Sequence, residues 1–159
     1  MLVYFRHAET PNYEDPEPGS LENCATQRNL SKPGREMARA IGLAFRELDI
    51  PIGIVRASPF CRCVDTARLA FGRAEPDGWL RLSGDDNDPE ELKRRDLLKR
   101  MARIKPLPGT NTIFVGHGSG PGALGAPGFA AEGEAAIVRP TGDGFVYLGS
   151  IKPDGWVKP

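Results

Sequence analysis

A chain of 159 residues is expected to form one domain, because single domains most often contain about 100–150 residues. Its 21 basic residues balance 21 acidic ones, so the net charge of zero gives no electrostatic reason to expect a nucleic acid or an anionic membrane as a partner. No apolar segment approaches the roughly 20 residues that a membrane span requires.

The N-terminal part of the chain predicts a strand, a long loop and a helix. Leu2–Phe5 is a short apolar run typical of a buried strand, and Pro11–Gln27 is a polar stretch typical of an irregular loop. Ser31 is a suitable N-cap, with Pro33 in the first turn of the helix that follows. One face of this helix is apolar and comprises Met37, Ala40, Ile41, Ala44, Phe45 and Leu48.

The middle of the chain predicts a second strand and two more helices. Ile52–Ala57 is another apolar run, and Cys61–Phe71 predicts a helix behind a Ser-Pro pair. The stretch Gly72–Pro89 is acidic and rich in turn residues. Glu90–Ile104 predicts a charged helix whose buried positions are Leu92, Leu97, Leu98 and Met101.

The C-terminal part predicts a third strand and a hairpin. Thr112–Gly116 is apolar, whereas the glycines that follow it disfavour a helix. Ala135–Arg139 and Phe145–Ile151 flank a turn and predict a hairpin, after which we expect a loose tail. Strands that alternate with helices predict a single α/β domain over residues 1–159 with a mainly parallel sheet.

Three cysteines, Cys24, Cys61 and Cys63, lack the spacing of a metal site. Their odd number favours reduced thiols, as expected in the cytoplasm. A Cys24–Cys61 disulfide is the alternative. It would indicate an oxidising compartment, periplasmic or secreted, for a chain whose leader has been removed.

The chain has only two histidines, and both directly follow predicted strands. Arg6 and His7 follow the first apolar run, and His117 follows the third. Arg62 lies shortly after the second run. In open α/β sheets the ligand crevice lies beyond the carboxyl ends of the parallel strands, so we expect these four side chains at one rim.

Two guanidinium groups beside two imidazoles suit a phosphoryl group. Arginine matches phosphate oxygens with a fork of donors, and a neutral imidazole keeps one unprotonated nitrogen that can attack phosphorus. A structural role is the plain alternative for each histidine. A zinc site would need a third ligand and is disfavoured by the adjacent arginines. A serine hydrolase built on Ser58 or Ser119 would lack the G-x-S-x-G nucleophile elbow.

Four motifs, in order, resemble those of the histidine phosphatases of the phosphoglycerate mutase-like superfamily. They extend from residue 2 to about residue 120 and comprise Arg6-His7-Ala8-Glu9-Thr10, Leu30-Ser31-Lys32-Pro33-Gly34, Ser58-Pro59 with Arg62, Thr66 and Ala67, and Gly116-His117-Gly118. The resemblance implies a three-layer α/β/α sandwich with a mainly parallel central sheet and places the chain with the small phosphatases.

The resemblance also implies a role for each residue of the site. His7 would be the nucleophile that becomes phosphohistidine, while Arg6, Arg62 and His117 would hold the phosphoryl oxygens. The implied substrate-binding set is Arg6, Arg62, Glu9, Thr10, Gly118 and Ser119. Within it, the glutamate would orient an arginine or its own loop, unless it is simply a solvated carboxylate. No metal and no cofactor is expected, because the arginines supply the positive charge.

Three features depart from the family pattern. Ala8 stands in place of a glycine. The usual general acid has no clear counterpart, so Asp85 and Asp86 are the candidates, with an exposed acidic turn as the alternative reading. Phosphohistidine phosphatases lack a clear acid because their leaving group needs no proton. Gly118 and Ser119 replace an expected helix and either direct backbone N–H groups at the phosphate or form a flexible loop.

The expected function is that of a metal-independent phosphatase for a small phosphorylated substrate or a phosphoprotein, with no nucleic-acid or membrane partner. A non-catalytic phospholigand-binding module of the same fold is the main alternative. A phosphoglycerate-type mutase is less favoured, because the segment between Phe71 and Asn111 is too short for a substrate-retaining lid. The sequence does not predict the oligomeric state.

Overall fold

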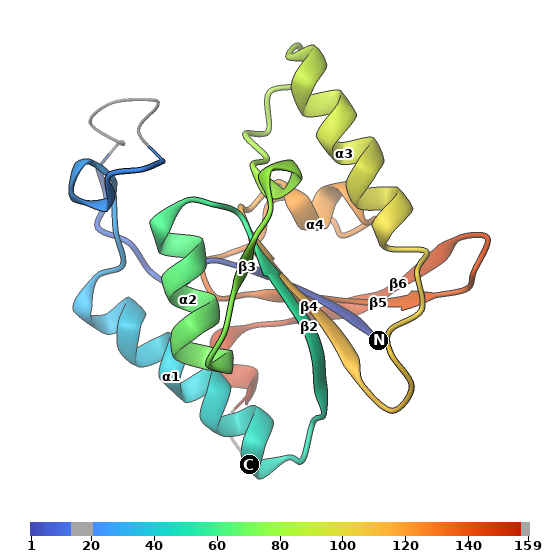
Figure 1. Cartoon of the computed structure of the whole chain (residues 1–159), viewed down its shortest axis with the longest axis horizontal. Coiled ribbons are helices and arrows are strands. Elements are labelled where there is room, and N and C mark those ends of the chain that lie inside the picture. The colour runs from blue at the N-terminus through green and yellow to red at the C-terminus, as the bar shows by residue number, and fades with distance from the viewer. Residues whose placement is uncertain (14–20, 157–159) are drawn as a thin grey trace.

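The computed structural model describes residues 1–13 and 21–156, which form a six-stranded sheet with helices on both faces (Figure 1). The strands are β1 (Leu2–Arg6), β2 (Ile52–Ala57), β3 (Glu75–Pro76), β4 (Asn111–Gly116), β5 (Ala135–Pro140) and β6 (Phe145–Ile151). The helices are α1 (Lys32–Glu47), α2 (Cys61–Phe71), α3 (Pro89–Met101) and α4 (Gly120–Ala123), with short 3₁₀ helices η1 (Cys24–Thr26), η2 (Gly78–Leu80) and η3 (Pro153–Trp156). Residues 14–20 of the predicted Pro11–Gln27 loop lie outside the described residues.

The sheet has the strand order β3-β2-β4-β1-β5-β6. The first four strands in this order are parallel, and β5 and β6 are antiparallel to their neighbours. Leu2 lies opposite Thr112 and Arg6 opposite Gly116, so β1 and β4 end at the same level. The predicted α/β fold with a mainly parallel sheet is confirmed, and the predicted hairpin is the β5–β6 pair.

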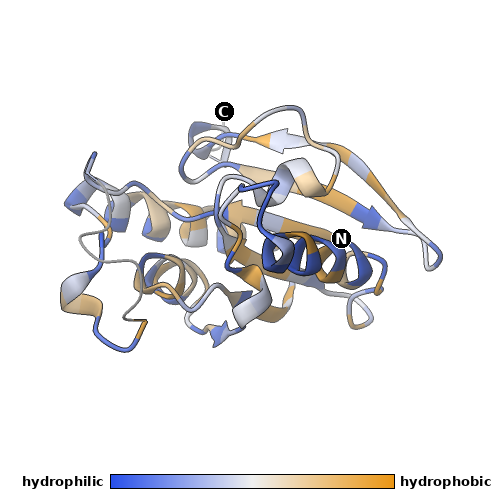
Figure 2. Cartoon of the chain, turned by 90° about the horizontal axis from the view of Figure 1, so that it is seen from above, coloured by the Kyte–Doolittle hydropathy of each residue, from blue (hydrophilic) through white to orange (hydrophobic). Residues whose placement is uncertain are grey.

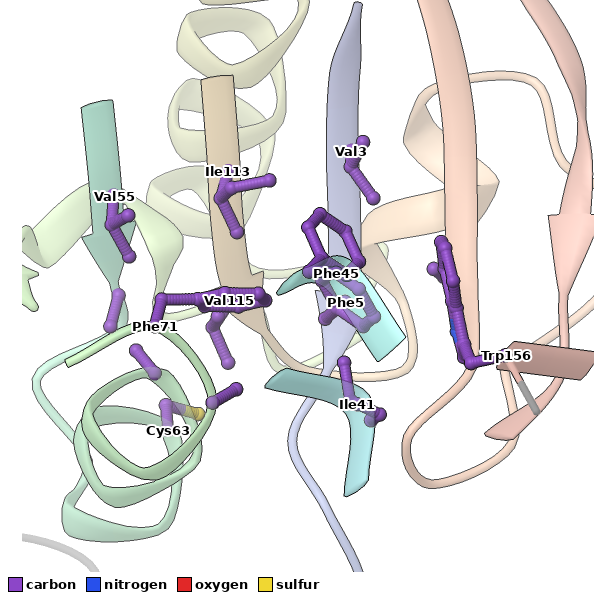
Figure 3. Packing of buried hydrophobic residues seen from close by; sticks show 14 of the residues in the cluster. Val3, Phe5, Ile41, Phe45, Val55, Cys63, Phe71, Ile113, Val115 and Trp156 are labelled. Atoms are coloured by element: carbon purple, nitrogen blue, oxygen red, sulfur yellow. The ribbon is translucent and has the colours of Figure 1, made fainter. Parts of the chain in front are cut away.

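One face of the sheet packs on α1, α2 and the C-terminal η3. Alternate residues of a strand point to opposite faces, so Val3 and Phe5 of β1 and Val115 of β4 share this side. They contact Phe45 of α1 and Phe71 of α2 in one buried cluster (Figure 3). The other residues of β1 and β4 must therefore find partners on the opposite side.

Those residues pack on the second helical layer. Leu2 and Tyr4 of β1 and Phe114 of β4 form a separate cluster with Leu80 of η2 and Leu98 of α3. Figure 2 shows mostly hydrophobic strands in the middle of the molecule and hydrophilic residues mainly on the surrounding helices and loops. The fold is thus the three-layer α/β/α sandwich that the resemblance implied.

The buried stripe of α1 differs from its predicted face. Ala40 and Leu48 were expected in the core but are exposed. The helix buries Gly42 instead, where a Cβ atom would lie only 2.0 Å from the carbonyl oxygen of Ala70. The helix is therefore turned toward α2, which it contacts as well as the sheet.

The predicted core face of α3 is confirmed at Leu98 and Met101, which pack on the second buried cluster, and wrong at Leu92 and Leu97. Leu98 is fully buried, but Leu92 and Leu97 are 51% and 38% exposed. Glu91, in the first turn of the helix, is fully buried. Its carboxylate accepts hydrogen bonds from the backbone N–H groups of residues 83 and 84 and from Arg95. A satisfied buried carboxylate thus takes a place that the apolar pattern assigned to leucines.

The expected reduced state of Cys24 and Cys61 is wrong, because the two residues form a disulfide with Cα atoms 5.7 Å apart. Cys63 is a free, buried cysteine. The bridge joins η1 to the first residue of α2, two segments that are 37 residues apart in the chain. The Cys24–Cys61 disulfide named as the alternative is therefore the one that forms, and only the tertiary fold, not the cysteine spacing, could decide for it.

Two other differences concern the C-terminal half. The expected loose tail contains η3, and Trp156 is buried against Phe5 and Phe45. The glycine-rich segment after β4 includes the short helix α4, and α3 ends at Met101 rather than Ile104. Within the described ranges, none of the helices is both long and apolar enough to cross a membrane.

Candidate active site

Three parallel strands end side by side and place the predicted residues at one edge of the sheet. The backbone N–H of His7 donates to the carbonyl of Gly116 at 2.9 Å, and that of Ser58 donates to the carbonyl of Val115 at 2.8 Å. These bonds extend the ladder past the strand ends. His7 and His117 therefore face each other, with ring centroids 5.9 Å apart and rings nearly perpendicular.

A network of buried hydrogen bonds holds His7. Its Nδ1 lies 2.8 Å from the carbonyl oxygen of Ala8. A carbonyl can only accept, so Nδ1 carries the proton and Nε2 of the neutral ring keeps its lone pair. The N–H of Ala8 donates to Thr66 Oγ1, which in turn donates to the carbonyl of Arg62. The histidine motif and the Ser-Pro motif are thus joined around His7.

The site keeps both imidazoles neutral. Burial, together with the nearby Arg62, Arg6 and Arg28, lowers the pKa of His7 to about 3, although the hydrogen bond to the carbonyl of Ala8 opposes the shift. Burial and the same arginines also place the pKa of His117 well below its usual value. An empty site at neutral pH therefore presents two uncharged rings to an incoming anion.

The ring of His117 is fixed on two sides. Ser58, which is fully buried, places its Oγ 2.9 Å from Nε2 of His117. The ring of Phe60 meets it edge-on with centroids 5.1 Å apart. The backbone N–H of His117 donates to Tyr4 Oη at 3.1 Å, so a residue of the core sets the position of the β4 end. The motif serine is therefore a partner of the second histidine.

The side chain of Arg6 is oriented by residues that were not predicted from the sequence. Its Nη1 donates to the carbonyl of Ala130 at 2.8 Å, and its Nη2 lies 3.7 Å from Glu132 Oε1. The hydroxyl of Thr10 donates to the same carboxylate oxygen at 2.8 Å. Glu132 thus ties the loop after β1 to the segment before β5 and orients the guanidinium group.

A cavity of about 500 Å³ opens over these groups, and it is lined by Arg6, His7, Arg28, Phe60, Arg62, Arg81, Leu82, Ser83, Asp88, Arg94, His117, Gly118 and Phe129. Of the six predicted catalytic residues, this set contains Arg6, His7, Arg62 and His117 but neither of the two candidate acids. Arg62 is 5% exposed, and its guanidinium group lies 4.4 Å from the centroid of Phe60. Arg28, which follows η1, is a third arginine close enough to both histidines to lower their pKa.

Of the remaining predicted binding residues, only some lie in the cavity lining. Gly118 lines the cavity, whereas Ser119 is buried and lines a neighbouring hollow. Glu9 accepts a hydrogen bond from Ser31 Oγ at 2.7 Å and so anchors its loop to the N-cap of α1. Thr10 contacts Glu132. Glu9 and Thr10 therefore anchor the loop after β1 and do not line the cavity. Their direct contact with substrate stays a prediction.

The acidic candidates lie away from the cavity lining. Asp85 accepts from the backbone N–H of Asn87, and Asp86 pairs with Arg95. Among the described residues, Asp88 is the carboxylate that lines the cavity. It also caps α3, since its Oδ1 accepts from the N–H of residue 90 at 2.9 Å. The acid role of Asp85 and Asp86 stays a prediction, and Asp88 is a candidate that sequence reasoning missed.

No group of three or more His, Cys, Asp or Glu side chains that could hold a metal ion occurs within residues 1–13 and 21–156. That finding does not itself test the expectation of a metal-independent reaction.

Comparisons with known proteins agree with this architecture. The chain is similar to the protein histidine phosphatase SixA complexed with tungstate, at a TM-score of 0.66 and 16% identity over 96% of this chain and 97% of that one. It is also similar to phosphoserine phosphatase from Entamoeba histolytica in complex with 3-phosphoglyceric acid, at a TM-score of 0.64 and 14% identity over 98% of each chain. A mycobacterial glucosyl-3-phosphoglycerate phosphatase complexed with VO3 matches at a TM-score of 0.64 and 19% identity, over 92% of this chain and 96% of that one.

No family model and no curated protein matches the sequence. At the identities above, the structural likeness shows the fold alone. The chain has the phosphoglycerate mutase-like fold of the histidine phosphatases, so the resemblance seen in its four motifs is confirmed for the architecture.

Proposed function

We propose that this chain is a phosphatase that hydrolyses a phosphomonoester or a phosphohistidine through a covalent phosphohistidine on His7. The observation that carries the proposal is the hydrogen bond from Nδ1 of His7 to the carbonyl of Ala8, 2.8 Å long, which leaves Nε2 as a free nucleophile beside a cavity lined by arginines. The solved phosphatases of the same fold, some with tungstate or VO3 bound, support this reading.

In the first step, the lone pair of His7 Nε2 attacks phosphorus. The bond between phosphorus and the leaving atom breaks, and its electron pair departs with the leaving group. Arg6, Arg28 and Arg62 hold the equatorial oxygens while charge spreads over them. In the second step, water attacks the phosphorus, the N–P bond breaks, and its electron pair returns to Nε2 as inorganic phosphate leaves. The arginines supply the positive charge that a metal would otherwise provide.

Proton donation limits which substrates react readily. The carboxylate of Asp88 lines the cavity, but its Oδ2 lies 3.8 Å from Arg94 Nη1 and its Oδ1 caps α3. This arrangement supports substrates whose leaving group is stable without prior protonation, such as a phosphohistidine or an aryl phosphate. Unactivated alkyl phosphates would depend on Asp88 as acid.

Steady hydrolysis of p-nitrophenyl phosphate tests the proposal. We expect turnover that is unaffected by EDTA and abolished in His7→Ala. Arg62→Gln should lower kcat/KM by about 100-fold or more, as for the loss of one transition-state donor. Arg100→Gln is the matched control, because Arg100 is exposed on α3 and pairs only with Asp96 among the described residues. Binding of vanadate without turnover would instead identify a non-catalytic module.

The disulfide supports an oxidising compartment, periplasmic or secreted, over the cytoplasm. Disulfides persist in such compartments and are reduced in most cytosols. A thiol titration under denaturing conditions without reductant checks this point: one reactive thiol, from Cys63, is expected. Three reactive thiols in protein purified from its natural compartment would favour the cytoplasm.

A further inference from the structure

The side of the cavity formed by the segment between η2 and α3 carries two arginines that the phosphoryl chemistry does not use. Arg81 directly follows η2, and Arg94 lies in α3. Both line the same cavity as His7 and His117. We call this pair the distal arginines.

Three other arginines line the cavity, and their charges act on the two histidines. Arg6, Arg28 and Arg62 each depress the pKa of His7 and of His117, whereas neither Arg81 nor Arg94 is among the groups that do so. A phosphoryl group on His7 would therefore be held by the first three. The distal pair would face whatever is attached to that group.

Arg81 is a cation without an acidic counterpart in the described part of the chain. No carboxylate of those residues lies within 4.0 Å of it, and its buried Nε has no hydrogen-bond partner. Its guanidinium group lies 6.0 Å from the centroid of Phe60, the ring that also contacts Arg62. The guanidinium group of Arg81 therefore has a buried, unused donor next to an aromatic ring, an arrangement that suits an anionic ligand.

Among the described residues, the one acidic group near Arg94 makes a long contact with it. Arg94 Nη1 is 3.8 Å from Asp88 Oδ2, beyond hydrogen-bond length, and one Asp88 oxygen is already used by the helix cap. The cavity thus holds five arginines and, from the described residues, one carboxylate. A phosphoryl dianion held by Arg6, Arg28 and Arg62 leaves this charge incompletely balanced, because the distal arginines would not be used to hold it.

We propose that the distal arginines form a second anion subsite and that the preferred substrate is a small phosphorylated molecule whose leaving group carries a carboxylate or a second phosphate. This inference rests on the proposed function for the position of the phosphoryl group. A cavity of about 500 Å³ suits a molecule of that size. The specificity-determining residues are then Arg81 and Arg94.

The test compares substrates that differ in one charge. 4-Carboxyphenyl phosphate and 4-carbamoylphenyl phosphate have nearly the same shape, and neither needs a strong acid for its leaving group. We expect the wild type to favour the carboxylate in kcat/KM by about ten- to a hundredfold, the range of a charge-assisted hydrogen bond. The same comparison of 1,4-phenylene bisphosphate with phenyl phosphate reports on a second phosphate.

The variants assign the preference to the distal arginines. In Arg81→Gln/Arg94→Gln the ratio of kcat/KM for the charged substrate to kcat/KM for the neutral one should fall toward one. The reason is that kcat/KM should drop more for the charged substrate. Arg100→Gln, on the same helix but paired with Asp96, should keep the wild-type ratio. A wild-type ratio near one for both pairs, or a ratio unchanged in the double variant, overturns the inference even when turnover is normal.

Equilibrium binding separates this inference from the proposed function. His7→Ala cannot form the phosphoenzyme, but its distal arginines are intact. Calorimetric titration of that variant should give tighter binding of 4-carboxyphenyl phosphate than of the carbamoyl analogue, and the difference should disappear when Arg81 and Arg94 are also replaced by Gln. Preferential binding in a protein that never turns over would uphold the subsite and reject the phosphatase. Equal binding rejects the subsite.

Discussion

Ser58 Oγ lies 2.9 Å from His117 Nε2, and both belong to segments that directly follow parallel strands. The contact gives the serine of the Ser-Pro motif a physical role: it fixes the ring that faces His7. Because the serine is fully buried, its hydroxyl has little else to bond with.

Ser58→Ala should therefore lower kcat by about tenfold, the value of one buried hydrogen bond of ordinary strength. The measurement that separates positioning from a merely structural effect is a double-mutant cycle with His117→Ala. We expect Ser58→Ala to cost almost nothing once His117 is absent. Equal losses in both backgrounds would contradict a role through the histidine.

The disulfide between Cys24 and Cys61 should stabilise both the fold and the Arg28 side of the site. Cys24→Ser/Cys61→Ser should lower the free energy of unfolding by about 2–4 kcal/mol, as expected for closing a loop of this length. Urea denaturation measures this loss. Reductant should reproduce it in the wild type and have no effect on the double variant. A Cys63→Ala control retains the bridge and should remain sensitive to reductant.

The depressed histidine pKa values predict a specific pH dependence of stability. The pKa of His7 falls from about 6.5 in the unfolded chain to about 3 in the folded one. Below pH 6.5 the unfolded state binds the proton that the folded state excludes, so this group destabilises the fold as the pH falls toward 3.

Urea unfolding of wild type and His7→Asn between pH 7.5 and 4 should show the difference directly. The advantage of the wild type over the variant should shrink on acidification, by at most about 1.4 kcal/mol per pH unit. Both proteins should be measured without phosphate, because a bound anion would stabilise the protonated ring. Parallel stability curves would contradict a neutral, buried His7.

Asp88→Asn should separate substrates by their need for a proton. Asparagine retains the N-cap of α3, so the variant should fold. We expect hydrolysis of an alkyl phosphate to slow by about 100-fold or more, while p-nitrophenyl phosphate changes much less. Asp85→Asn and Asp86→Asn serve as controls and should affect neither substrate. A selective loss in one of those two would restore the acid predicted from the sequence.

The part of the site that depends on strand ends could be predicted from the sequence. Apolar runs define β1, β2 and β4, and the residues after them must share an edge once the strands are parallel. This rule brings Arg6, His7, Arg62 and His117 to one edge of the sheet. The four motifs implied the roles that we propose for these residues.

The rest depends on tertiary contacts that leave no local pattern. Arg28 follows η1 in a polar stretch, and the disulfide at Cys24 brings that stretch to α2. Glu132 contacts Arg6, although it lies 126 positions further along the chain. Glu91 sits in the core only because loop N–H groups satisfy it. None of these contacts has a period or spacing that a sequence displays.

The central claim is that phosphorus is transferred to Nε2 of His7, and trapping the phosphoenzyme tests it most directly. Protein mixed with excess p-nitrophenyl phosphate is quenched in alkaline denaturant, where phosphohistidine survives, and the modified peptide is mapped by mass spectrometry. We predict one phosphate on His7 during turnover and none in His7→Asn. Sustained turnover with His7 unmodified, or with the phosphate on Ser58, would contradict the account.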